Sequence, residues 1–298
     1  MPLGVDRNIN SRGSAIYGLF HHANFEDKFV AQMVSDLKID TICHLAADAD
    51  VPDSVERPGK YYENNTSNTI KLLNNLVENK WRGKFIFSST AAVYKEKNSI
   101  ITETDVLEPP NPYGMSKLMC EQVLKDYHKV YGIDVVNFRY FNVAGAWDDV
   151  GDHLNSPHVI QRLCHAATNG NDFHIFGTDK NTTDGTCVRD YLHVRDVCDA
   201  HLQAIKYLNN NKGYYNYNLG TSFGVSVRSL VASFMLQTKE NISISCDEGR
   251  PGDPDHLVAD GHRFMADTKY TYNYSNLNSI IDSAWIYYKG KGSNYYGF

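Results

Sequence analysis

The chain has 298 residues, of which 42% are hydrophobic and 21% charged, and its formal net charge is −6. A chain of this length buries a substantial core without a metal or a disulfide framework, and its length suggests about two domains. The negative charge gives no attractive field for a polyanion, so we exclude nucleic acid as a partner.

The cysteines and the first residues of the sequence predict an intracellular protein. The six cysteines are dispersed and form no C-x-x-C pair, which excludes the common zinc and redox motifs, and we predict no metal site. The first 25 residues contain no apolar run of signal-peptide length, and no run of 18 apolar residues follows. We therefore expect a cytoplasmic protein with no membrane contact.

Helical and strand patterns alternate through the first half of the chain. Residues 1–24 have no clear period, and only 15–20 could form a short strand. After them we expect, in chain order, a helix over 25–37, a strand over 41–47, a helix over 66–77, a strand over 84–88, a helix over 113–131 and a strand over 134–140. Such alternation is typical of a parallel sheet with helices on both faces.

From residue 143 the pattern loosens into loops rich in Gly, Asp and Asn. Short strands are expected around 174–176 and 214–219, and helices near 157–168, 196–208 and 226–237. We therefore predict one domain over 1–142 and a smaller lobe over 143–298, with some elements of the lobe returning to the first domain.

The sharpest local signal is the segment PYGMSK at 112–117. Its Tyr113 and Lys117 lie four residues apart and share one face of a helix. An ammonium beside a phenol favours the phenolate, and so brings a group with a pKa near 10 toward the range of a general base. The motif alone also fits an ordinary surface helix, and both interpretations stay open on this evidence.

A hydroxyl cluster, Ser88-Ser89-Thr90, follows the strand expected at 84–88. Ligands bind at the carboxyl ends of parallel strands, although such a cluster is often only a turn. Combined with the helix that carries Tyr113 and Lys117, it predicts a catalytic trio. Thr90 would hydrogen-bond a substrate hydroxyl that Tyr113 deprotonates.

These residues, with the run RYFN at 139–142, resemble the extended short-chain dehydrogenase/reductases. The stretch TDGTCVRDYLHV at 183–194 is similar to the UDP-galactose (UDP-glucose) 4-epimerase branch of that family. Further matches are HLAA at 44–47, YYENN at 61–65, YNLG at 217–220 and RPGD at 250–253. The resemblance extends from about residue 25 to at least 285.

The resemblance implies interconversion of UDP-glucose and UDP-galactose through a 4-keto intermediate, with NAD as the hydride carrier. It makes Tyr113 the base, Lys117 its electrostatic partner and Thr90 the hydroxyl relay. The residues implied to bind the cofactor are Ala46, Asn65, Ser88, Tyr113, Lys117 and Tyr140. Related dehydratases carry an Asp-Glu pair after this Thr, whereas two alanines follow it here, which excludes water elimination.

The resemblance also implies a UDP-sugar site. Its residues are Asn142, His158, Val159, Phe176, Arg189, Arg250, Asp253 and Leu257. Asn142, Arg189 and Arg250 would hold the diphosphate, for which Arg is suited by its bidentate geometry. Taken singly, Arg189 could instead form a structural ion pair with Asp190, and Asn142 could cap a turn.

The remaining substrate residues are implied to set specificity. Phe176 and Val159 would flank the uracil, and Asp253 would accept from the uridine ribose. His158 stands where the epimerases often carry Asn. Leu257 falls at the position that gates the C2 substituent of the sugar, so a UDP-hexose and a UDP-N-acetylhexosamine both stay open as substrates.

The usual front end of the family is not found in this sequence. It comprises a strand, a G-x-x-G-x-x-G turn, a helix and a second strand ending in an acidic residue, and the loop that gives an Asp to adenine reads HAN at 22–24. We therefore predict an N-terminally truncated member, with an α/β, Rossmann-like parallel sheet that lacks its first βαβ unit. Residues 1–142 would form an incomplete NAD-binding domain, and 143–298 a smaller C-terminal nucleotide-sugar-binding lobe. Loss of the pyrophosphate anchor would weaken NAD binding by about two to four decades.

Two hypotheses stay open. The first is an active epimerase whose cofactor half is completed by the N-terminal segment or a partner, as the intact Tyr113, Lys117 and Thr90 favour. The second is a catalytically impaired epimerase-fold protein that binds nucleotide sugars or serves assembly, as the missing Gly-rich turn favours. We expect a homodimer or a partner to cover the open sheet edge. The resemblance implies a dimer contact through the helices at 66–77 and 113–131.

Overall fold

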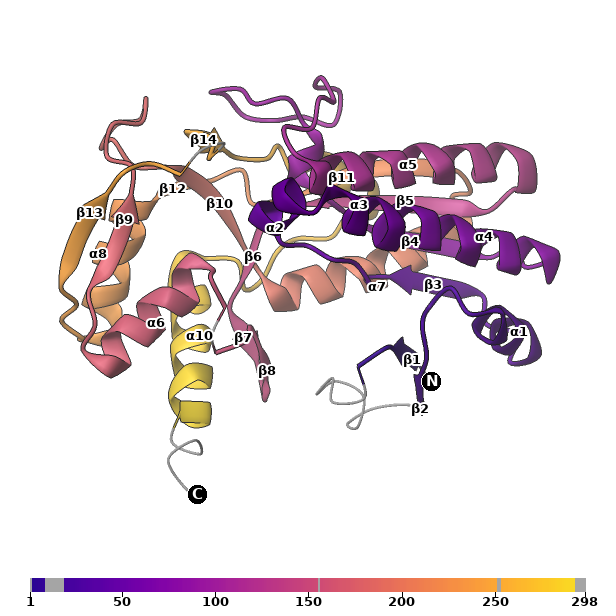
Figure 1. The fold of residues 1–298 in the computed structure, drawn as a ribbon, viewed down its shortest axis with the longest axis horizontal. Coiled ribbons are helices and arrows are strands. Elements are labelled where there is room, and N and C mark those ends of the chain that lie inside the picture. The colour runs from indigo at the N-terminus through magenta and orange to yellow at the C-terminus, as the bar shows by residue number, and fades with distance from the viewer. Residues whose placement is uncertain (1, 9–18, 155, 251–252, 293–298) are drawn as a thin grey trace. The chain divides into compact units, whose positions relative to one another are not determined.

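The computed structural model describes residues 2–8, 19–154, 156–250 and 253–292. The chain forms two compact units (Figure 1). Unit 1 comprises Met1–Lys95, Asp105–Arg139 and His201–Tyr217, and unit 2 comprises Glu96–Thr104, Tyr140–Ala200 and Asn218–Phe298. The chain therefore passes between the units several times, and 201–217 return to the first.

Unit 1 is built on a four-stranded sheet with the order β11-β5-β4-β3. The strands are β3 (Thr41–His44), β4 (Lys84–Thr90), β5 (Asp134–Tyr140) and β11 (Tyr214–Leu219). β3 and β4 are parallel, with Thr41 opposite Lys84 and His44 opposite Phe87. Phe85 and Phe87 are almost fully buried, and each contributes about 1.5–3 kcal/mol to the free energy of unfolding. The prediction of a parallel sheet is confirmed at this pair.

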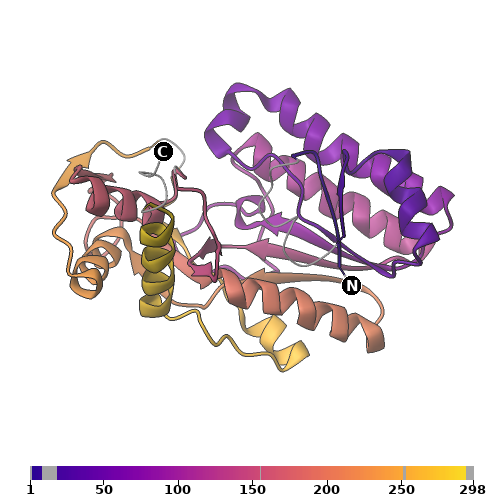
Figure 2. The same ribbon diagram turned by 90° about the horizontal axis from the view of Figure 1, so that it is seen from below.

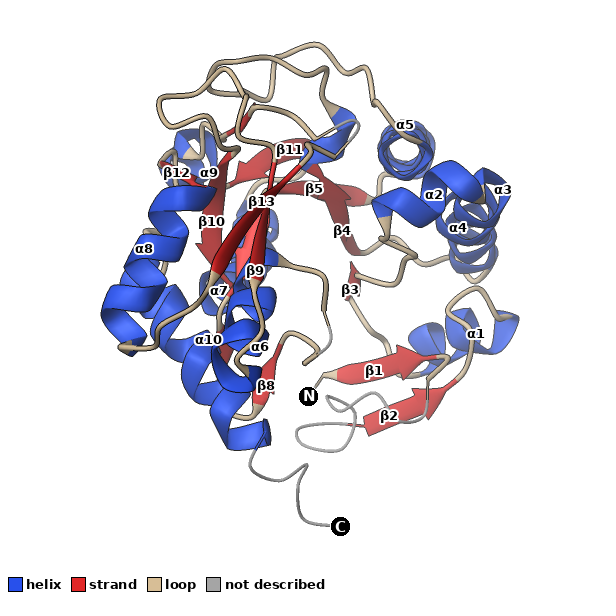
Figure 3. Cartoon of the chain, turned by 60° about the vertical axis from the view of Figure 1, so that its left-hand side comes forward, coloured by secondary structure: helices blue, strands red, loops and turns tan. Residues whose placement is uncertain are grey.

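Two N-terminal strands form a separate parallel pair, β1 (Leu3–Asp6) and β2 (Leu19–His22), with Asp6 opposite His22 (Figure 3). This finding corrects the expectation that no strand ending in an acidic residue precedes the first helix, because β1 ends at Asp6. Four-residue strands are too short to show a period, which is why the pattern missed them. Of the strand considered at 15–20, residues 15–18 lie outside the described part.

Helices cover both faces of this sheet. They are α1 (Lys28–Asp36), α2 (Val51–Glu56), α3 (Pro58–Tyr61), the π-helical turn η1 (Tyr62–Ser67), α4 (Asn68–Glu78), the short 3-10 turn η2 (Ala91–Val93) and α5 (Pro112–Tyr131). α4 and α5 lie side by side over one face, and the part of α7 (Val194–Asn210) from His201 onward lies over the other (Figure 2). The helices predicted at 25–37, 66–77 and 113–131 are confirmed, with shifted starts for the first two.

Local sequence signals explain the limits of α5. The side chain of Asn111 accepts a hydrogen bond from the Gly114 amide at 2.9 Å, and Pro112 occupies the first turn. The helix ends at Gly132, whose φ of 71° is left-handed and therefore favours glycine. These caps fix the position of the residues that α5 presents.

Unit 2 contains several small sheets. β10 (Val188–His193) pairs in parallel with β6 (Asn142–Ala144) and β14 (His256–Leu257), and antiparallel with β12 (Gly224–Ser226). The other pairs are β9 (Phe173–Phe176) with β13 (Ile244–Asp247), and β7 (Ala146–Trp147) with β8 (Val150–Gly151).

The helices of unit 2 are α6 (Val159–Asn169), the first part of α7, α8 (Val227–Thr238), α9 (His262–Thr268) and α10 (Leu277–Gly292). Of these, α6, α8 and α10 contribute to its hydrophobic core. Leu163, Phe173, Leu230, Phe234 and Ile281 are almost fully buried in one cluster. The helices predicted near 157–168, 196–208 and 226–237 are confirmed within two residues at each end. Across the described ranges, none of the helices combines the length and apolarity that a membrane span needs.

Candidate active site

The predicted catalytic residues of unit 1 meet where β4 ends. Lys117 on α5 donates a hydrogen bond from Nζ to the Ser88 carbonyl at 2.7 Å. The Thr90 side chain lies close enough to the Tyr113 hydroxyl to lower the pKa of Tyr113. The oxygen of Thr90 also accepts from the Ala92 amide at 3.2 Å, which starts η2. The structure therefore brings Tyr113, Lys117, Thr90 and Ser88 together.

Burial controls the charge of Lys117. Its side chain is 2% exposed, and Nζ lies 4.8 Å from the centre of the Phe87 ring. Burial lowers the pKa of Lys117 to about 8, because a buried ammonium loses its hydration. The group is therefore still mostly protonated at neutral pH.

Burial acts on Tyr113 in the opposite direction. It raises the pKa of Tyr113, while the nearby Thr90 side chain lowers it, and the net change is upward. The ring of Tyr61 meets that of Tyr113 edge to face at 6.4 Å and so adds to its apolar surroundings. The sequence argument expected the neighbouring ammonium to lower this pKa. That expectation is wrong, because desolvation outweighs the effect of Thr90.

Asn65, predicted to bind the cofactor, is committed to contacts within unit 1. It is 2% exposed, and its amide donates to the Asp48 carbonyl at 2.9 Å and to Ser116 Oγ at 3.0 Å. Its side-chain oxygen accepts from the Asp48 amide at 2.9 Å. Asn65 therefore joins the loop after β3 to α5.

A pocket of about 270 Å³ opens at the carboxyl ends of β1 and β3. Its lining is Val5, Asp6, Arg7, Asn24, Phe25, Glu26, Leu45, Ala46, Ala47 and Asn64. Of these, only Ala46 was predicted as a site residue. The acidic end of β1 and the polar residues after β2 were missed because the strands themselves were not recognised; an apolar-polar alternation over 3–6 is the only signal that could have revealed them.

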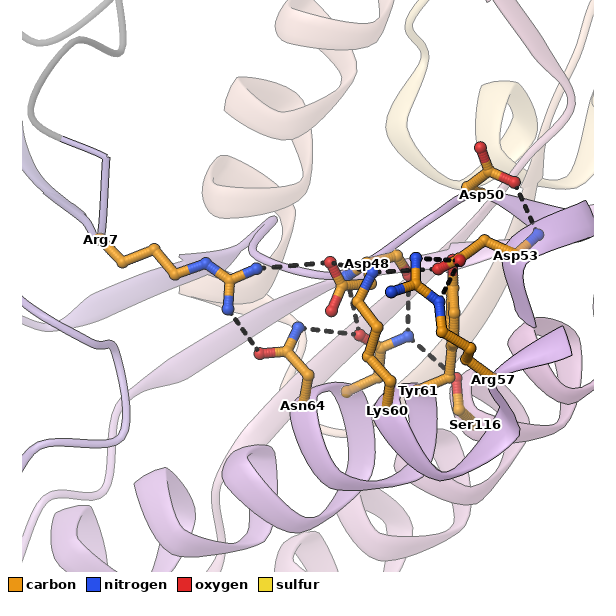
Figure 4. Close-up of polar contacts among 10 residues, drawn as sticks. Arg7, Asp48, Asp50, Asp53, Arg57, Lys60, Tyr61, Asn64 and Ser116 are labelled. Carbon is orange, nitrogen blue, oxygen red and sulfur yellow. Dashed lines mark hydrogen bonds and ion pairs between the residues drawn. The ribbon is translucent and has the colours of Figure 1, made fainter.

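An ion-pair network extends from Arg7 and Asn64, which line this pocket, to α2 and α3 (Figure 4). Arg7 donates to Asp48 at 3.3 Å and to Asn64 at 3.3 Å. Asp53 accepts from Lys60 and Arg57, which lower its pKa to about 2, and Tyr61 donates to it at 2.9 Å. The network connects β1, the loop after β3 and the helix α3 that carries Tyr61.

The predicted diphosphate residues belong to unit 2. Arg189 is 8% exposed and forms an ion pair with Asp253, so its partner is not Asp190. Asp190 is buried and accepts from the Thr221 side chain at 2.6 Å instead. Tyr140 and Asn142 lie at the start of a unit 2 segment, and the buried side-chain oxygen of Asn142 has no hydrogen-bond partner in the described residues.

Phe176 and Arg250 form the second cluster of unit 2. The Arg250 guanidinium lies 4.0 Å from the centre of the Phe176 ring, and that of Arg162 lies 4.9 Å from it. Arg162 was not predicted as a site residue, because a basic residue on an amphipathic helix such as α6 is usually an ordinary surface charge. Two guanidinium groups therefore lie near the Phe176 ring, and both are suited to bind an anionic ligand.

Three further predicted substrate residues lie elsewhere in unit 2. His158 pairs with Asp152 at 2.8 Å, and that carboxylate raises the pKa of His158. Val159 begins α6 and packs against the core, so only part of its surface is free. Leu257 on β14 lies opposite Arg189 in the strand register. No cluster of His, Cys, Asp or Glu suited to a metal occurs within the described ranges.

Comparisons with known proteins agree with this geometry. The model of the NAD dependent epimerase/dehydratase family matches residues 3–220. A UDP-glucose 4-epimerase of Lactobacillus helveticus is 38% identical over 282 residues, covering 93% of this chain and 85% of that protein. One of Streptococcus mutans is 36% identical over 301 residues, covering 98% and 90%.

A solved structure extends the similarity to three dimensions. The UDP-glucose 4-epimerase from Brucella ovis, in complex with NAD, has a TM-score of 0.89 and 33% identity, covering 96% of this chain and 90% of that one. The chain therefore belongs to the NAD dependent epimerase/dehydratase family, as a member of its UDP-glucose 4-epimerase group.

Proposed function

We propose that this protein is a UDP-glucose 4-epimerase, which interconverts UDP-glucose and UDP-galactose and uses NAD. The observation that carries the proposal is the contact of α5 with the end of β4, where Lys117 donates to the Ser88 carbonyl at 2.7 Å and Tyr113 lies near Thr90. The 38% identity to a UDP-glucose 4-epimerase over most of the chain supports the choice of substrate.

The pocket of unit 1 fits one half of a dinucleotide. It lies at the carboxyl ends of parallel strands, where such cofactors bind, and the carboxylate of Asp6 at the end of β1 suits ribose hydroxyls. The small side chains of Ala46 and Ala47 leave room for a close approach. When bound, NAD supplies the acceptor and donor of hydride for C4 of the sugar.

The roles of the chain's own residues follow from their contacts. Tyr113 takes the proton of the sugar's 4-hydroxyl and returns it, and Thr90, which lies near Tyr113, orients that proton transfer. Lys117, mostly protonated at neutral pH, stabilises the phenolate. In unit 2, Arg250 and Arg189 bind the diphosphate, Phe176 stacks on the uracil, and the unpartnered oxygen of Asn142 accepts from the substrate.

The experiment is an incubation of purified protein with UDP-glucose and added NAD, followed by chromatography of the nucleotide sugars. UDP-galactose should accumulate to equilibrium, and Tyr113→Phe should slow its formation at least about 100-fold. If saturating NAD gives no turnover while UDP still binds, the protein is a nucleotide-sugar binder and the proposal fails. Repeating the incubation with UDP-N-acetylglucosamine decides the C2 preference at Leu257.

We also propose that residues 1–298 lack the strand, the Gly-rich turn and the helix that precede the acidic-ended strand in the family, a strand that β1 supplies here. Three observations support this: no G-x-x-G-x-x-G turn occurs in the sequence, β1 pairs only with β2, and β3 pairs only with β4 within the described residues. The sheet then lacks a strand between β1 and β3, and NAD binds weakly. NAD that survives desalting, seen as absorbance of the purified protein, would argue against it.

We further propose a homodimer through α4 and α5. Its support is the exposed apolar surface of α5, where Met119 is 42% and Val130 72% exposed. Light scattering after size exclusion should give twice the chain mass, and Val130→Glu should shift the protein toward the monomer. A monomer at micromolar concentration would exclude this contact.

A further inference from the structure

A buried ion pair lies one helical turn beyond Lys117. Glu121 on α5 is 2% exposed and Arg139 on β5 is 1% exposed. Arg139 donates from Nη2 to Glu121 Oε2 at 2.6 Å and from Nε to Oε1 at 3.0 Å. Its third nitrogen, Nη1, donates to the Tyr94 hydroxyl at 2.8 Å, and its guanidinium lies 4.9 Å from the Tyr94 ring centre. The pair is therefore fully desolvated and held in one geometry.

Glu121 also holds the strand that carries the site. The Ser89 hydroxyl, on a residue 1% exposed, donates to Glu121 Oε1. Ser89 stands between the two residues of β4 that contact the catalytic side chains, because the Ser88 carbonyl binds Lys117 and Thr90 lies near Tyr113. The backbone on both sides of Ser89 is therefore anchored through one carboxylate.

The three residues of α5 that meet the end of β4 lie along one face of the helix. Tyr113, Lys117 and Glu121 are four residues apart on α5, so all three face the same way. Each one meets one of three consecutive residues at the end of β4, which are Thr90, Ser88 and Ser89 respectively. The first two contacts belong to the site already described, whereas the third has no chemical role in it.

Stability alone gives a poor account of this pair. Removing two charges from water costs more than their attraction often returns, and well-packed apolar residues of similar volume would serve the core as well. An apolar pair could not bind the Ser89 hydroxyl, however. Since the charge of Glu121 is compensated by Arg139, its effect on Lys117 is geometric.

We propose that Glu121 and Arg139 are positioning residues for the epimerase reaction, which fix the Ser88 carbonyl and the Thr90 hydroxyl through Ser89. The inference rests on the proposed function, because it assigns the pair to the same site. Glu121 and Arg139 lie outside the reacting groups. Loss of their contact with Ser89 should therefore lower kcat and leave the binding of UDP-glucose unchanged.

The test compares Ser89→Ala with a matched control, Ser54→Ala. Ser54 is equally buried, and its hydroxyl donates only to the Val51 carbonyl within α2 at 2.6 Å. Each variant loses one buried hydroxyl, so the melting temperature should fall by a similar amount in both. We expect kcat to fall about tenfold in Ser89→Ala with unchanged KM for UDP-glucose, and less than about twofold in Ser54→Ala.

A second readout needs neither cofactor nor turnover. Carbon-13 labelling of the lysine ε-carbons allows the Lys117 titration to be followed by NMR, with its signal assigned from Lys117→Arg. The Ser88 carbonyl stabilises the ammonium, so its displacement in Ser89→Ala should lower the titration midpoint by about half a pH unit. Ser54→Ala should leave the midpoint unchanged. If Ser89→Ala does not fold, Tyr94→Phe removes the hydroxyl that accepts from Nη1 of Arg139 and should shift the midpoint in the same direction by less.

The outcomes separate the two proposals. An unchanged Lys117 midpoint in a folded Ser89→Ala protein overturns the positioning role, whether or not the enzyme turns over. In an active enzyme, equal kcat values for Ser89→Ala and Ser54→Ala overturn it as well. A wild-type protein without epimerase activity overturns the proposed function alone, and the titration still decides the role of Glu121 and Arg139.

Discussion

The proton chemistry of the site depends on how burial acts on two neighbouring residues of α5. Burial raises the pKa of Tyr113 and lowers that of Lys117 to about 8, so it favours the neutral form of each group. A neutral phenol beside an ammonium is the resting pair near pH 7. Under the proposed function, Tyr113 must therefore lose its proton before it can accept one from the substrate.

Tyr113→Phe tests this assignment directly. We expect a loss of about 10²–10⁴-fold in kcat, because the variant removes the general base and leaves the helix and the ring packing in place. Binding of UDP should be unchanged, since the nucleotide residues belong to unit 2. Steady-state kinetics measures the loss of kcat, and calorimetry with UDP measures the binding. A variant that keeps more than a tenth of the wild-type activity would exclude Tyr113 as the base.

His44 makes the stability of unit 1 depend on pH. It is buried against Phe85 and Phe87, its Nε2 lies 2.9 Å from Thr69 Oγ1, and burial followed by the charge of Lys117 lowers its pKa to about 3. Above pH 6.5 the ring is neutral in both the folded and the unfolded chain. Below that pH only the unfolded chain takes the proton, so the free energy of unfolding falls by about 1.4 kcal/mol per pH unit.

Urea unfolding at pH 7 and pH 5 measures this effect. Between pH 7 and pH 5, the free energy of unfolding should fall by about 2 kcal/mol more in the wild-type protein than in His44→Gln, because the variant has no imidazole to protonate. The comparison cancels the other titrating groups, which are shared. Parallel losses in both proteins would show that His44 is not held neutral.

The motif of 112–117 predicted that Tyr113 and Lys117 share one face of a helix, which the structure confirms, but it did not predict that the pKa of Tyr113 is raised. Spacing places an ammonium near a phenol, and that suggests a lowered pKa. The raised value comes from the packing of residues distant in sequence, such as Tyr61, around the ring. The spacing of residue types in a motif predicts which groups are neighbours, but it does not predict how far those groups are removed from solvent.

At the scale of elements, the start of α5 is set by the cap at Asn111. The side chain accepts from the Gly114 amide, and its loss leaves that N–H without its partner. Asn111→Ala should therefore lower the free energy of unfolding by about 1 kcal/mol. Asn111→Asp keeps an acceptor and should stay within about 0.5 kcal/mol of wild type. Equal stability of the two variants in urea would show that the cap contributes nothing.

Elements were predictable in proportion to their length and periodicity. α5 and the strand at 134–140 follow the predicted ranges closely, because long apolar periods mark them. β1 and β2 span four residues each, which is too short for an alternation to stand out from chance. η1 is a π-helical turn directly before α4, and no sequence pattern marked it. The pocket residue Asp6 was missed with the strand that carries it, whereas Asn24 was noted only as the residue that replaces the family's Asp.

For the whole molecule, the account requires that the pocket of unit 1 binds NAD. Asp6→Ala should weaken NAD binding about tenfold, because a charge-assisted hydrogen bond to a ribose hydroxyl is lost. Asp36→Ala removes a carboxylate of α1 outside the pocket and should bind NAD as the wild type does. Titration calorimetry of both variants decides this, and equal affinities would place the cofactor elsewhere.

The central claim is that this chain inverts C4 of a UDP-hexose at Tyr113. The most direct measurement uses UDP-glucose that carries deuterium at C4, added NAD and mass spectrometry of the product. The account predicts UDP-galactose that retains the deuterium, and at least about 100-fold slower formation of that product with Tyr113→Phe. Product that has exchanged its deuterium for solvent hydrogen, or no product at saturating NAD while UDP binds, would contradict it.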